Sequence, residues 1–254
     1  MSDAAGALLF ARYAYPPNAL GLCGADSPAT LLEYGDAGES DGGLAALART
    51  FDGAWPYLTL IAAANGIEDP LDPRVVEAYW VGNPLLSRVP GRKLARHVED
   101  RFHGRLGRAE ETVGTIAAAG AVPHHCFHVF AVYPWLGLLR GGMVEQPLHV
   151  LDQCRTTAAL VVAREGDEAD VLAPPLLWED GSLRLGEPEL RRVQWRAGGR
   201  SFVAPPEPGQ LVSLHWDFVC DVLSPSGAER LDRVTRHVLG LVNEGAGRGS
   251  LLAA

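Results

Sequence analysis

The spacing of turn residues changes near Pro147, and this change divides the chain into two parts with different backbone patterns. In the first part, apolar residues recur at helical spacing between isolated Gly and Pro residues. In the second part, apolar runs of about four to seven residues are separated by Gly, Asp or Pro every ~8–12 residues, which is typical of small β-barrels. We therefore expect an α+β protein, with a helical domain over residues 1–147 and a small β-barrel with a C-terminal helix over residues 148–254.

Local signals place helices in the first part and at the end of the chain. Asp72-Pro73 combines a capping residue with proline at the first helical position, and so predicts a helix start. Residues 35–43 (GDAGESDGG) are small and polar and predict a loop. The helices expected on these grounds cover parts of residues 44–64 (as two short helices), 72–82, 92–103, 109–119 and 225–243.

The N-terminal segment contains consecutive prolines and a cysteine. Because proline lacks an amide proton and restricts the residue before it, Tyr15-Pro16-Pro17 is expected to be extended or turned. Cys23, which precedes Gly24, has two interpretations. It is either a thiol ligand at a site shared between the two domains, or part of an irregular segment that packs aromatic residues on the helical domain.

Composition excludes several classes of function. The chain has 22 basic and 31 acidic residues and a net charge of −9, whereas a protein that binds nucleic-acid phosphates carries a basic surplus. It contains no apolar run of about 18 residues, the length needed to cross a membrane. The N-terminus lacks the features of a secretory signal, and the four cysteines are expected to be reduced thiols. We expect a cytoplasmic protein that binds neither nucleic acid nor membrane.

Residues 124–128 (HHCFH) concentrate candidate metal ligands. On a helix, His124 and His128 share a face, and on a strand His124, Cys126 and His128 share one. Either arrangement offers two or three nitrogen and sulfur ligands to a transition metal. The alternative is a buried apolar segment whose histidines hydrogen-bond to the backbone.

A second candidate pair is Cys154 and His215. Cys154 precedes the first expected strand, and His215 lies in the alternating segment at residues 211–216. Alternation alone favours a half-buried histidine with a satisfied hydrogen bond. A shared metal ion would instead bring the two side chains within about 4–6 Å of each other.

The segments around this pair resemble the HypC/HupF family of [NiFe]-hydrogenase maturation chaperones. Residues 154–167 (CRTTAALVVAREGD) open with a cysteine, run into a strand with paired valines and turn at Gly-Asp, as that family does. Residues 208–215 (PGQLVSLH) are similar to the family's second signature, which ends in a histidine before a C-terminal helix. The family's cysteine is N-terminal, however, whereas Cys154 is internal, and Gln210 replaces the usual Asp.

The resemblance implies a function and a site. Cys154 corresponds to the family's iron-binding cysteine, and His215 corresponds to the histidine beside it, as a second ligand or hydrogen-bond partner. The protein would then be an accessory protein for metal-cofactor assembly rather than a catalyst. It would hold an iron fragment and pass it to the hydrogenase large subunit or another maturation protein.

Three other hypotheses stay open on the sequence. The first is a metal- or haem-dependent enzyme that uses the His124–His128 cluster, with haem or another transition metal as its cofactor. The second is one site at the domain interface, with ligands from both domains. The third is a purely structural interaction protein.

Overall fold

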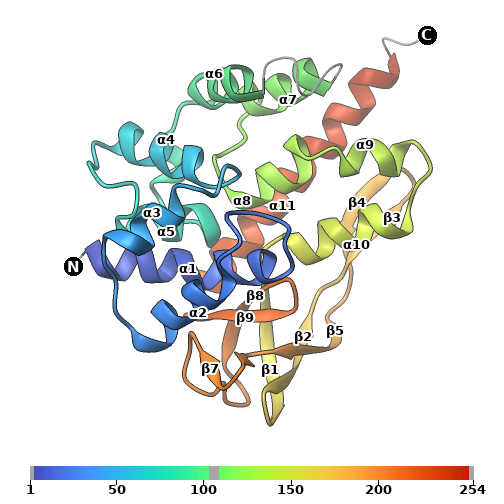
Figure 1. Ribbon diagram of the computed structural model, residues 1–254. Coiled ribbons are helices and arrows are strands. Elements are labelled where there is room, and N and C mark those ends of the chain that lie inside the picture. Colours follow the sequence, from blue (N-terminus) through green and yellow to red (C-terminus); the bar gives the residue numbers. More distant parts are fainter. Residues whose placement is uncertain (1–2, 103–108, 252–254) are drawn as a thin grey trace.

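The computed structural model describes residues 3–102 and 109–251. It is a mixed α+β structure in which the N-terminal helices pack beside and above a group of strands (Figure 1). The long C-terminal helix α11 (Pro225–Leu251) runs between the two parts of the molecule. The predicted α+β class, with helices at the N-terminal side and a helix at the C-terminus, is confirmed. Within the described ranges, no helix is long and apolar enough to cross a membrane.

Most of the predicted N-terminal helices are present near the predicted positions. Asp72 caps α5 by accepting the backbone N–H of Arg74 at 2.9 Å, as its position before Pro73 predicts. The segment around Gly53 and Pro56 does separate two short helices. The helices are α1 (Asp3–Ala19), α2 (Pro28–Ala37), α3 (Gly42–Ala48), α4 (Trp55–Asn65), α5 (Pro73–Trp80), the 3₁₀ turn η1 (Leu86–Arg88), α6 (Gly91–Phe102) and α7 (Ala109–Ala118).

Two local predictions in this part are wrong. The Tyr15-Pro16-Pro17 segment is helical, with both prolines near the C-terminal end of α1, where each of them removes one backbone hydrogen bond from the helix. Burial of the α1 aromatic residues in the core outweighs that loss. The loop expected at residues 35–43 begins later, because α2 continues to Ala37 and ends at Gly38, whose φ of +67° is left-handed.

After α7 the chain forms several short helices and then a series of strands. The short helices are α8 (His125–Phe127), the π-helical turn η2 (His128–Val132), α9 (Trp135–Arg140) and α10 (Glu145–Cys154). The predicted boundary at Pro147 falls inside α10. The strands are β1 (Thr157–Glu165), β2 (Glu168–Ala173), β3 (Leu176–Glu179), β4 (Ser182–Leu185), β5 (Glu189–Gln194), β6 (Arg196–Ala197), β7 (Arg200–Ser201), β8 (Leu211–His215) and β9 (Phe218–Leu223).

Five of these strands pair around a closed barrel in the order β1-β2-β5-β9-β8. All neighbours are antiparallel except β5 and β9, which meet in the single parallel pair Gln194–Phe218. The hairpins β3-β4 and β6-β7 lie outside this ring. A small apolar core that includes Val171, Val193 and Val212 fills the barrel.

The larger core joins the two parts of the chain. It contains Phe10 of α1, Phe127 of α8, Phe218 of β9 and Leu231 of α11 in one continuous cluster. Helix α1 also makes polar contacts with the barrel. Its Arg12 forms an ion pair with Asp221, and the Tyr13 hydroxyl lies 2.8 Å from the Ser213 hydroxyl on β8. The helical part therefore fixes the position of strand β8, which carries His215.

The buried contact between Tyr13 and Ser213 can be tested by a double-mutant cycle. Tyr13→Phe is expected to lower the free energy of unfolding by about 1–2 kcal/mol, because it leaves the Ser213 hydroxyl without this partner. Ser213→Ala in the Tyr13→Phe background is expected to add little. Urea unfolding of the four proteins measures both effects, and fully additive losses would contradict a direct interaction.

Candidate metal centre

Three potential metal ligands from distant parts of the chain meet at one point. One ligand atom from each of His125, Cys154 and His215 lies within 4.8 Å of the others, and all three side chains are buried. His125 comes from α8, Cys154 ends α10, and His215 ends β8. The expected proximity of Cys154 and His215 is confirmed. His125 adds a third ligand from the helical part of the chain.

A proline in α1 creates the hydrogen bond that orients His215. In an uninterrupted helix, the N–H of residue 17 would bond to the Tyr13 carbonyl, but Pro17 has no N–H. The Tyr13 carbonyl oxygen instead lies 2.7 Å from Nδ1 of His215. Because a carbonyl only accepts, the His215 proton is on Nδ1. Its Nε2 carries the lone pair and has no hydrogen-bond partner among the described residues.

Each ring nitrogen of His125 lies beside an oxygen atom of another residue. Nδ1 lies 3.1 Å from the Tyr79 hydroxyl, which donates to the Gly53 carbonyl at 2.9 Å. Nε2 lies 2.8 Å from the Cys154 carbonyl and 3.9 Å from its sulfur. Because the Cys154 carbonyl only accepts, the Nε2–H donates to it, and Nδ1 is left as an acceptor facing the Tyr79 hydroxyl, whose single proton serves either Nδ1 or the Gly53 carbonyl.

A metal ion on His125 Nε2 would replace the hydrogen bond from this nitrogen to the Cys154 carbonyl. The ring proton would then be on Nδ1 and donate to the Tyr79 oxygen, and Tyr79 would keep its bond to the Gly53 carbonyl. Metal-binding histidines almost always have their second nitrogen held in this way. The unpartnered Nε2 of His215 and this chain behind His125 both fit a bound ion.

Burial sets the protonation states of the three side chains. It lowers the pKa of His125 well below its usual value and lowers the pKa of His215 to about 4, so both rings are neutral near neutral pH. Burial also raises the pKa of the Cys154 thiol to about 12. The two imidazoles can therefore act as ligands directly, while Cys154 releases its proton when a metal binds. Nitrogen and thiolate donors suit Fe²⁺, Zn²⁺ and other borderline or soft ions.

The three ligands lie in the wall of a cavity of about 340 Å³. Aromatic side chains form much of the rest of its surface, and none of the described residues that line it is Asp, Glu, Lys or Arg. Leu22 and Cys23, from the loop between α1 and α2, line it together with Gln146 and Val150 of α10. In Figure 1 this loop lies in front of the centre of the molecule, near α8 and α10.

The other predicted ligands in the 124–128 segment do not join this cluster. Nδ1 of His124 accepts the Cys126 backbone N–H at 3.1 Å and so caps α8. The Cys126 sulfur lies 3.4 Å from the Thr235 hydroxyl of α11. Nδ1 of His128 lies 3.2 Å from the Tyr57 hydroxyl, although His128 also lines the cavity. Neither candidate set, His124 with His128 on a helix or His124 with Cys126 and His128 on a strand, belongs to the three-residue cluster found among the described residues.

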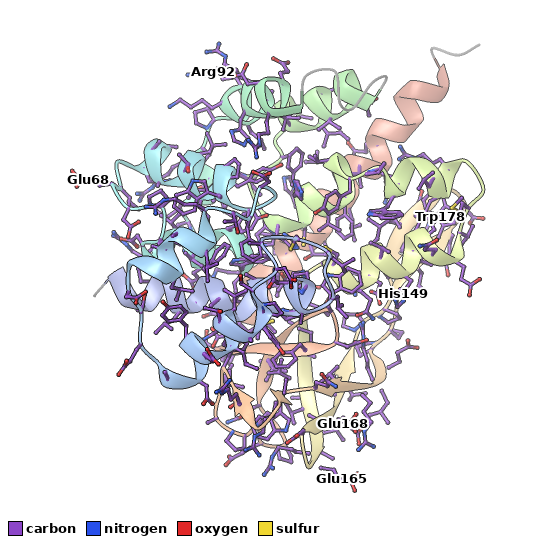
Figure 2. The ribbon with its side chains drawn as sticks, viewed as in Figure 1. Glu68, Arg92, His149, Glu165, Glu168 and Trp178 are labelled. Carbon is purple, nitrogen blue, oxygen red and sulfur yellow. The ribbon has the colours of Figure 1, made fainter. Side chains whose placement is uncertain are left out.

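The backbone explains this outcome. The helical turn at α8 covers only His125–Phe127 and passes into a π-helical turn at His128, so neither helical nor strand periodicity continues across the five residues. Neither periodic pattern groups His125 with His124 and His128, so no spacing signal identified it as a ligand. His149, a further histidine in this region, is exposed on the outer side of α10 (Figure 2).

The fold and this cluster define an α+β protein with a buried candidate metal centre of two imidazoles and one thiol. The chain belongs to a family of unknown function, DUF6390, whose pattern matches residues 2–248. No curated protein and no solved structure shows a significant match.

The role of Pro17 can be tested by restoring the missing amide. Pro17→Ala adds an N–H that competes with His215 for the Tyr13 carbonyl, and we expect metal affinity to fall by about tenfold or more. The ¹⁵N shifts of the His215 ring are expected to show a mixture of tautomers. Pro16→Ala is the matched control, because its new N–H faces the Arg12 carbonyl. Equal effects of the two substitutions would contradict this role.

Proposed function

We propose that this protein is a cytoplasmic accessory protein for metal-cofactor assembly that holds an iron fragment, most specifically in the maturation of [NiFe] hydrogenase. One observation carries the proposal. Cys154 and His215, the two residues singled out by the resemblance to the HypC/HupF chaperones, lie in one buried cluster although 61 positions separate them. After His215 the chain forms one further strand, β9, and then the C-terminal helix α11, and the resemblance implies a C-terminal helix after the histidine.

The chemistry of the cavity supports holding a metal rather than catalysing turnover. A catalytic acid or base needs a pKa near the working pH. Burial keeps the pKa of His125 and His215 far below neutrality, and no carboxylate or amine is among the described residues that line the cavity. A thiolate, by contrast, binds soft iron complexes and exchanges with another thiolate ligand. These properties suit storage and transfer.

An exposed apolar side chain beside the cavity supports transfer to a protein partner. Leu22 lines the cavity and is 53% exposed, so it is available for contact with a partner. The partner in this proposal is the hydrogenase large subunit or another maturation protein, which would take the iron fragment beside Leu22.

The alternative of a metal- or haem-dependent enzyme loses its main support. It depended on ligands from the His124–His128 segment, of which only His125 joins the cluster. The side chains of His124, Cys126 and His128 contact Cys126 N, Thr235 and Tyr57. The possibility of one interface site gains support, but through His125.

The proposal is tested on full-length protein purified without oxygen from cells that make the candidate partners. Iron analysis and infrared spectroscopy are expected to show bound iron with bands from diatomic ligands. Cys154→Ala is expected to lose almost all of this iron, because it removes the thiolate. His215→Ala is expected to retain a small fraction.

His128→Ala is the control, since His128 lines the cavity but is bonded to Tyr57 outside the cluster. It is expected to keep its iron. Loss of metal only in His128→Ala, or a haem absorption band in the parent protein, would favour the enzyme. A parent protein without metal under these conditions would overturn the proposal.

A further inference from the structure

The candidate ligand set leaves a positive charge without a partner. A divalent ion bound by the Cys154 thiolate and two neutral imidazoles keeps one uncompensated positive charge. The described residues that line the cavity include no carboxylate to balance it. Burying an unpaired charge in apolar surroundings costs free energy. A second anionic ligand would neutralise this charge and remove that cost. A three-ligand set also leaves a coordination position open.

Cys23 is a second thiol in the wall of the same cavity. It lies in the loop at residues 20–27, and the Asn18 side-chain amide donates to its carbonyl at 2.8 Å and also to the Ala25 carbonyl. Gly24, with a φ of +78°, lies so close to the Phe51 ring that a Cβ atom would be 2.4 Å from it. These contacts hold the backbone beside Cys23 against the cavity.

Two further observations connect Cys23 with the cluster. Nε2 of His215, whose side chain is 1% exposed, has no partner among the described residues and lies in the wall of the same cavity. In addition, Cys23 and Cys154 both line this cavity, and a shared cation would stabilise both as thiolates.

We propose that Cys23 is the fourth ligand of this centre, so that the metal ion is held by two thiolates and two imidazoles. This inference rests on the proposed function only in that a metal binds the cluster. Each thiol releases its proton to solvent as its sulfur–metal bond forms, and the complex with a divalent ion is neutral. Because the Cys23 sulfur is outside the atoms that lie within 4.8 Å of one another, binding draws the loop at residues 20–27 inward.

This arrangement assigns a role to the loop. With the loop drawn inward, Cys23 completes the coordination and closes the cavity beside Leu22. When the loop moves out, the ion keeps three ligands and has one open position toward the rim. A thiolate from a partner protein can occupy that position, so release of the Cys23 sulfur is the step that permits transfer.

The test uses the full chain loaded anaerobically with Zn²⁺ or Co²⁺. X-ray absorption of the zinc-loaded protein is expected to show two sulfur neighbours at about 2.3 Å, and Cys23→Ala is expected to show one. In the cobalt-loaded protein, the thiolate-to-cobalt charge-transfer absorption is expected to fall to roughly half in Cys23→Ala. Hydrogen exchange at residues 20–27 is expected to slow on zinc binding only when Cys23 is present.

Cys126→Ser is the matched control, because this thiol is buried outside the cluster and the Thr235 hydroxyl can bond to the introduced serine. It is expected to keep two sulfur neighbours. Cys23→Ser checks that the loss in Cys23→Ala is not a folding defect, and both variants are compared by circular dichroism. One sulfur neighbour in the zinc-loaded parent protein, or azide supplying the fourth ligand there, overturns the inference and leaves the proposed function intact. No zinc in the parent protein overturns both.

Discussion

The hydrogen bond between the Tyr13 carbonyl and His215 is the contact on which the candidate centre depends. It joins α1 to the last residue of β8, fixes the proton on one ring nitrogen and turns the other toward Cys154 and His125. The bond exists because Pro17 cannot use the same carbonyl. A residue that normally ends helices therefore serves here to couple a helix to a strand.

The same region shows how the helical part and the barrel share one centre. Tyr13 stacks on Trp80, and Trp80 contacts the rings of both His125 and His215. The two histidine rings are 5.0 Å apart, centroid to centroid. Aromatic packing thus limits the movement of both ligands, and the apolar surroundings keep both imidazoles neutral. Rigidity and neutrality are together what a site needs to hold a metal ion without performing proton transfer.

Sequence patterns predicted the secondary structure correctly where neighbouring residues determine it. Asp72-Pro73 predicted the start of α5, and the change near Pro147 predicted the transition from helices to strands. Cys154 and His215, which the sequence analysis treated as a pair, lie close together. His125 could not be found in this way, because its position depends on a single helical turn that changes into a π-helical turn. The prediction that the prolines of α1 lie in an extended or turned segment was wrong for a related reason. Burial of the aromatic residues of α1 in the core outweighed the local preference of proline against a helix.

The ligands come from segments that are synthesised far apart in time. His125 leaves the ribosome well before Cys154, and His215 follows only when most of the chain has been made. The Tyr13 carbonyl that orients His215 is among the first groups to appear. Domains generally fold as units during synthesis, so the centre is complete only after β8 has closed against α1. A chain truncated before His215 therefore lacks one of the three side chains of the cluster, and the cluster forms only late in folding.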